Sequence, residues 1–220
     1  MGAEVIATRD SAPTGLGWPA AVAVASVGMG YGLTRWSEAG PHNRMLPWIL
    51  GRSLGIAAYL CLVALVGLGL WFGHPARRSG RSRIHPASVL RLHAALALAA
   101  LVLVVGHVGA LVMDHYARLG VLGAILPGRA GYRPWPVAAG TLGLYAGLVA
   151  GLSAALAGGV ARRIWLPIHR LAAITVGLIW FHAVLAGTDT PALRWMYILT
   201  GGLILLLGLS RHLLPQPVPS

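Results

Sequence analysis

Long apolar blocks alternate with short polar segments along most of this chain. At about 20 residues each, the blocks match the length of α-helix that crosses the hydrocarbon core of a bilayer. The prolines lie between the blocks or near their starts, where a missing backbone N–H would be unbonded in any case. The pattern predicts six membrane-spanning helices, at residues 17–34, 47–72, 87–113, 137–160, 166–186 and 192–210.

The six helices predict a single all-α domain, an integral membrane helix bundle over residues 17–211. A polar N-terminal segment, 1–16, precedes the bundle, and a proline-rich tail, 212–220, follows it. Composition supports the membrane assignment, because only 10% of the residues are charged, whereas a soluble domain carries roughly 25%. Segment 1–16 has no hydrophobic stretch of the signal-peptide type, so no cleaved targeting peptide is expected.

All seventeen basic residues are arginines, and the formal net charge is +12. The arginines lie mostly in loops or just inside the predicted helix ends, which is typical of residues that fix membrane orientation and not of a nucleic-acid groove. Six spans place both termini and ten arginines on one side, with seven on the other. The positive-inside rule therefore predicts a multi-pass protein of the cell (inner) membrane with cytoplasmic termini and no nucleic-acid partner.

Four histidines lie inside two of the predicted helices: His93 and His107 in the third, His169 and His182 in the fifth. An imidazole in hydrocarbon is costly and usually serves a function. His93 and His107 are 14 residues apart, which separates them by about 21 Å along a helix and about 40° around it. The two helices run in the same direction, so His93 is predicted at the depth of His169. His107 is likewise predicted at the depth of His182, and two facing imidazoles are what six-coordinate haem iron requires.

The interval on the fifth helix does not fit a straight helix. Thirteen residues separate His169 from His182, which leaves the two side chains about 140° out of phase. Either the helix bends between them or two porphyrins are offset sideways, and the sequence leaves both open. Two alternatives to the binding of two haems remain. The histidines could bind one haem, or they could serve without haem in packing, metal binding or proton relay. Zinc is disfavoured because neither cysteine nor carboxylate completes either pair.

The spacing of 14 and 13 in a six-helix bundle resembles the ferric reductase-like transmembrane domain. That superfamily includes NADPH oxidases, ferric reductases and the haem-binding subunit of a bacterial methionine sulfoxide reductase system. The resemblance covers residues 47–211. Residues 51–55 (GRSLG) resemble the start of the domain, and residues 168–170 (IHR) resemble the start of its fifth helix. At Leu111 the chain lacks a further histidine of the oxidases, which disfavours dedicated oxygen chemistry.

The resemblance implies two haem b groups held between the third and fifth helices, and it implies no catalytic residue in this chain. The iron ligands would be His93 and His169 for the inner haem and His107 and His182 for the outer haem.

Three arginines lie near these positions. Arg91 and Arg170 flank the inner ligands, and Arg52 begins the second helix on the outer side. They are candidates for contacts with haem propionates or with the electron acceptor, because arginine pairs with carboxylates through two hydrogen bonds. Anchoring of the helix ends at the membrane surface is the alternative.

The remaining polar features are predicted to be structural. The longest outer loop, 114–136, is predicted to be an interfacial loop anchored by Tyr132 and Trp135. Cys61, midway along an apolar helix, is predicted to pack. Five further histidines are predicted to lie solvated in loops or near the C-terminus: His42, His74, His85, His115 and His212.

The chain has no G-x-G-x-x-G fingerprint and no flavin domain after its last helix, so FAD or FMN and NAD(P)H are expected to act only through a partner. The leading hypothesis is a b-type cytochrome, an electron-transfer component and not a complete reductase. It would carry electrons from a cytoplasmic flavin- or NAD(P)H-linked donor to an outer acceptor such as ferric iron, oxygen or a partner enzyme. The alternatives are a quinol-linked haem subunit of an extracytoplasmic oxidoreductase and a haem-free transporter or scaffold.

Overall fold

The computed structural model describes residues 44–75, 86–157 and 163–213, and within these ranges all regular structure is helical. Five segments are long and apolar enough to cross a membrane, with α7 and α8 together forming one of them. These segments confirm the helical membrane fold and five of the six predicted spans, while the first, 17–34, lies outside the described residues. The elements are α2 (Leu46–Phe72), α4 (Pro86–Met113), α5 (Gly120–Ile125), α6 (Pro134–Ala155), α7 (Trp165–His169), α8 (Ala172–Ala186) and α9 (Thr190–Leu213).

The predicted bounds of the fourth span, 137–160, are wrong at both ends. Helix α6 begins at Pro134 and its helical part ends at Ala155. Two prolines, Pro134 and Pro136, occupy its first turn, where proline is well tolerated because no helical N–H bond is lost. Arg133 precedes them with a left-handed φ of 40° and turns the chain into the helix.

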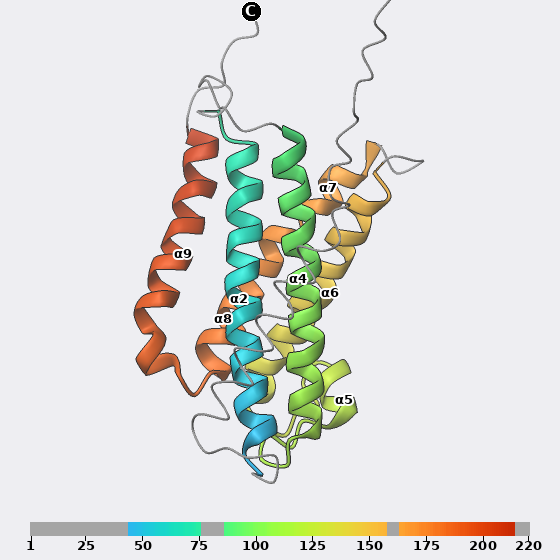
Figure 1. The fold of residues 1–220 in the computed structure, drawn as a ribbon, viewed down its shortest axis with the longest axis vertical. Helices are drawn as coiled ribbons and strands as arrows, with labels where there is room; N and C mark the ends of the chain where they lie inside the picture. The colour runs from blue at the N-terminus through green and yellow to red at the C-terminus, as the bar shows by residue number, and fades with distance from the viewer. Residues whose placement is uncertain (1–43, 76–85, 158–162, 214–220) are drawn as a thin grey trace, which may run out of the picture.

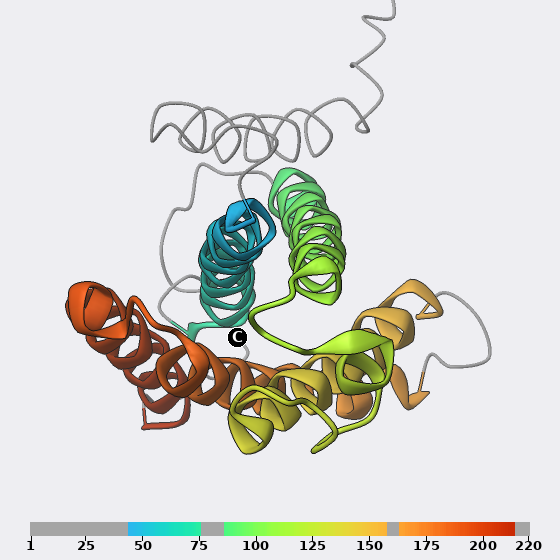
Figure 2. The ribbon, with the colours of Figure 1, turned by 90° about the horizontal axis from the view of Figure 1, so that it is seen from below.

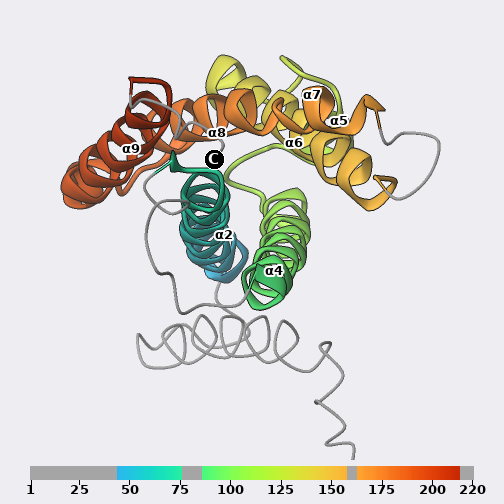
Figure 3. The ribbon, with the colours of Figure 1, turned by 90° about the horizontal axis from the view of Figure 1, so that it is seen from above.

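The helices form two layers. Helices α2 and α4 pack side by side as one antiparallel pair, and α6 packs in the same way against α7 and α8. Figures 2 and 3, which look along the bundle, show α2 and α4 in one layer and α6, α7, α8 and α9 in a curved second layer. The chain enters α2, α6 and α9 at the end of the bundle that also holds α5. We call this the α5 end.

Helix α2 makes contacts both within its own layer and with the second layer. Leu103 of α4 is fully buried against Leu54 and Ala58 of α2. Tyr59 of α2 shares a hydrogen bond with Thr200 of α9, an interhelical polar contact of the kind that stabilises bundles in lipid. Most other apolar side chains face outward, and no more than 33% of any spanning window is buried, as expected when lipid covers the remaining surface.

Candidate functional site

The four intramembrane histidines meet as two pairs. The first pair is His93 of α4 with His169 at the end of α7, and their ring centroids are 6.2 Å apart. The second pair is His107 of α4 with His182 of α8, and their ring centroids are 6.3 Å apart. The second pair lies toward the α5 end and the first toward the opposite end. The structure therefore brings together the same partners that matching depth predicts.

An interruption of the fifth span lets both of its histidines face α4. Helix α7 ends at His169 and α8 begins at Ala172. Between them, the N–H groups of Leu171 and Ala173 donate to carbonyls three residues earlier, at 2.9 and 3.0 Å. Such bonds tighten the helix and add about 20° of rotation per residue. This rotation reduces the predicted phase mismatch, so the structure shows a break in the fifth span, the first of the two alternatives.

Backbone carbonyls fix the orientation of the imidazoles. A carbonyl oxygen only accepts, so each bonded Nδ1 carries the proton and leaves Nε2 free as a ligand atom on the far edge of the ring. Metal-binding histidines are usually oriented by such bonds. The acceptors are Gly51 O for His107 (2.6 Å), Pro136 O for His182 (2.9 Å) and Ala150 O for His169 (3.0 Å), and the backbone of Leu65 is the hydrogen-bond partner of His93.

Three glycines let the rings reach these carbonyls. A Cβ added at Gly55 or Gly140 would lie only 2.7 Å from Nδ1 of His107 or His182, and at Gly69 it would lie 3.2 Å from Cε1 of His93. Side chains at these positions would push the rings off the helix surface. We call Gly55, Gly69 and Gly140 the contact glycines.

The contact glycines follow a rule that sequence reasoning missed. Each lies four residues after the carbonyl that bonds the same histidine, which is about one helical turn. On α2 the two carbonyls are 14 residues apart, as are the two glycines, and this equals the interval between the α4 histidines. The same interval separates the two carbonyls of α6. A glycine pair spaced like the histidines was therefore the available signal.

The donor set of each pair fits haem iron. A transition metal bonds an imidazole nitrogen at about 2 Å, so imidazoles on opposite sides of one metal have ring centroids about 6 Å apart, close to the observed 6.2 and 6.3 Å. Two nitrogens are too few for a tetrahedral zinc site, and within the described ranges no three ligating side chains gather. Haem iron needs only two protein ligands, because the porphyrin provides the other four.

The three candidate arginines have different surroundings. Arg52 makes a two-pronged ion pair with Asp189, through Nε at 2.7 Å and through a second guanidinium nitrogen. Sequence reasoning did not single out Asp189. Its carboxylate binds the edge of the Arg52 guanidinium that was predicted to contact a haem propionate or the electron acceptor. Arg91 is exposed and reaches Ser88 Oγ at 3.5 Å, and Arg170 is exposed directly after His169.

The Arg52–Asp189 pair links the start of α2 to the turn between α8 and α9. The two side chains are about one-third exposed, so solvent screens the pair. A double-mutant cycle with Arg52→Gln and Asp189→Asn, followed by thermal unfolding in detergent, is expected to give a coupling free energy of about 1 kcal/mol or slightly less. Strictly additive effects would show that the pair contributes nothing.

The connection from α4 to α6 closes over the α5 end. Tyr132 donates to the carbonyl of Ala186 at 3.2 Å, and Arg133 donates to the carbonyl of Leu185. These are the last carbonyls of α8, which have no partner within the helix. Trp135 is 80% exposed, so of the two predicted anchors Tyr132 holds the loop to the bundle while Trp135 faces outward.

The prediction that His74 is solvated is wrong. Its side chain is only 5% exposed, and its Nε2 lies 3.1 Å from Ser210 Oγ of α9. Its ring also stacks on Trp71, because the chain turns back against α9 where α2 ends. His115 is exposed as predicted, while His42, His85 and the side chain of His212 lie outside the described residues.

Comparison of the chain with models of known families, with curated proteins and with solved structures finds no match. The resemblance to the ferric reductase-like domain therefore stays a prediction from the sequence. The function has to be inferred from the geometry of the two histidine pairs.

Proposed function

We propose that the protein is a b-type cytochrome that carries electrons across a membrane through two bis-histidine haems. The observation that supports this function is the pairing of imidazoles at a metal-bridging separation at two depths of one apolar bundle. Under the arginine bias, the first pair is on the cytoplasmic side and the second on the outer side. The donor is then a cytoplasmic flavoprotein or another reduced carrier, and the acceptor is ferric iron, oxygen or a partner enzyme.

The chain's own residues account for the binding and placement of the groups. Haem b supplies a reversible one-electron change at its iron. His93 and His169 would hold one haem iron, and His107 and His182 would hold the other. Bonds from Nδ1 to backbone carbonyls fix the tautomer in which Nε2 is the ligand atom, and they increase the basicity of that nitrogen.

The depth of the two sites suits a crossing in stages. The 14-residue interval on α4 places the two binding sites about 21 Å apart along the helix axis. An electron would therefore cross the hydrocarbon core in shorter transfers instead of one long one. Between the two ligands of α4, Ala99 and Leu103 are almost completely buried. Apolar packing at this level excludes water from the interior of the bundle.

Spectroscopy of purified protein tests the proposal. Protein from cells supplied with haem precursor is expected to show a b-type reduced-minus-oxidised spectrum, with two haems per chain by pyridine haemochrome assay. A folded but colourless product from such cells would refute the function. Reduction by a quinol, compared with reduction by NADPH and a flavin reductase, distinguishes a quinol-linked subunit from a flavoprotein-linked one.

A further inference from the structure

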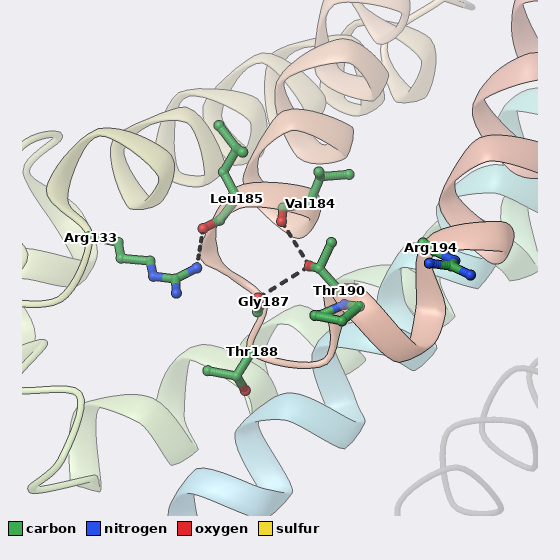
Figure 4. Close-up of a pocket in the computed structure, with 8 residues that line it drawn as sticks. Arg133, Val184, Leu185, Gly187, Thr188, Thr190 and Arg194 are labelled. Carbon is green, nitrogen blue, oxygen red and sulfur yellow. Dashed lines mark hydrogen bonds between the residues drawn. The ribbon is translucent and has the colours of Figure 1, made fainter.

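A depression of about 440 Å³ opens at the α5 end, at the turn between α8 and α9. Figure 4 shows Arg133 and Arg194 on either side of it, with the 184–190 segment between them. Arg133 comes from the start of α6 and Arg194 from the first turns of α9. The depression therefore lies where three spanning segments begin or end, which is the depth of lipid headgroups if the bundle crosses a bilayer.

The depression is positively charged. Arg133 and Arg194 both line it, and no acidic residue does. Asp189 belongs to the same turn, but its carboxylate is paired with Arg52. Asp114, the other acidic residue in the described ranges, is buried and accepts a bond from the N–H of Ala117. The two lining arginines thus have no described carboxylate to neutralise them.

One of the two guanidinium groups is held in place. Arg133 donates to the carbonyl of Leu185, and Figure 4 shows this bond beside the depression. The hydroxyl of Thr190 is occupied by the carbonyls of Val184 and Gly187. Arg194 donates no hydrogen bond to another described residue, and its guanidinium lies over the Trp195 ring, 5.6 Å from the ring centroid. Its N–H groups remain available for a ligand.

We propose that this depression binds a phosphate group, and that the headgroup of an anionic phospholipid supplies it. Arginine matches phosphate oxygens with paired N–H donors. Val184, Leu185 and Pro191 also line the depression and offer an apolar surface beside the charges, which suits the start of an acyl chain better than a free ion. Trp195 is 61% exposed next to Arg194, and tryptophan favours the membrane interface.

Native mass spectrometry of protein released from phosphatidylcholine nanodiscs, with and without phosphatidylglycerol, tests this site without reference to haem. Wild-type protein is expected to retain phosphatidylglycerol over phosphatidylcholine. Retention by the double variant Arg133→Gln/Arg194→Gln should fall about 30-fold, since each arginine contributes about 1 kcal/mol of attraction to an anionic headgroup. Arg194→Gln alone should show a smaller loss and spares the bond from Arg133 to Leu185. Arg129→Gln, an exposed arginine outside the depression, is the matched control.

Competition with inorganic phosphate distinguishes the sources of the phosphate group. Lipid retention that depends on the arginines and resists inorganic phosphate supports the headgroup. Arginine-dependent binding of inorganic phosphate in phosphatidylcholine alone, without preference for phosphatidylglycerol, keeps the phosphate site but overturns the lipid as its source. The site would be overturned if the wild type and both arginine variants retained equal amounts of phosphatidylglycerol, with thermal unfolding showing that each variant is folded.

Discussion

Replacing His107 with alanine is expected to remove one haem and leave the other bound. The substitution deletes one of the two protein nitrogens of the second pair, and six-coordinate haem iron held by His182 alone lacks its sixth ligand. The first pair shares no ligand with the second and lies about 21 Å away along the axis of α4. Haem content by pyridine haemochrome assay should therefore fall by about half, and the reduced-minus-oxidised spectrum should keep the bands of one haem.

Matched variants separate ligand loss from general damage. His115→Ala changes an exposed histidine eight residues further along the chain and is expected to leave the haem content unchanged. His93→Ala should remove the other haem and leave a spectrum complementary to that of His107→Ala. An unchanged haem content in His107→Ala, or the loss of both haems from folded protein, would contradict the assignment of the pairs.

Replacing Gly140 with valine is expected to weaken binding of the same haem although His182 is still present. A Cβ at this position would lie 2.7 Å from Nδ1 of His182, closer than such atoms approach, so the ring has to move away from α6. The bond from Nδ1 to the Pro136 carbonyl is then lost. Loss of an orienting bond of this kind typically lowers metal affinity about 10- to 100-fold, and a shift in the reduction potential of any haem retained should accompany it.

The control for this variant lies on the same helix. Nothing in the described structure lies within 4 Å of a Cβ added at Gly151, so Gly151→Val tests the general effect of valine in α6. It is expected to leave haem affinity and potential as in the wild type. Equal behaviour of Gly140→Val and Gly151→Val in haem titration and redox titration would show that the contact glycine does not position His182.

The two spans that carry the paired histidines hold them in the same way. Helix α2 supports the rings from α4, and α6 supports the rings from α7 and α8. In each case the supporting helix runs antiparallel to the span that carries the histidines. Its backbone carbonyl accepts the hydrogen bond from the imidazole, and a small residue follows one helical turn later. For His169 that residue is Ala154, four positions after Ala150. The two helix pairs therefore orient their histidines in the same way.

The spans and the histidine pairs were open to prediction because both depend on position along a helix. Apolar length marks a membrane span, and axial rise converts the interval between His93 and His107 into depth. The predicted bounds of α2, α4 and α9 are accordingly close to those observed. The start of α6 was not, because prolines in a first helical turn and prolines in a preceding loop look alike in sequence.

Other features depend on which atoms of distant segments meet, and sequence patterns carry little information about that. The mismatch of phase between His169 and His182 predicted a bend or an offset, yet only the fold showed a break directly after His169. The partner of Arg52 is 137 residues away, and His74 is buried because α2 ends against α9. Neither contact follows from the local composition around these residues.

The sequence by itself determined that the chain is an apolar helical bundle and that its intramembrane histidines occur at two depths, since hydropathy and helical rise are local properties. Tertiary structure alone decided which carbonyl orients each imidazole, which glycines admit the rings and where the fifth span breaks. Those features arise from the packing of α2 against α4 and of α6 against α8. The physical reason is that hydrogen bonds and steric contacts between helices depend on their relative placement, which no single helix encodes.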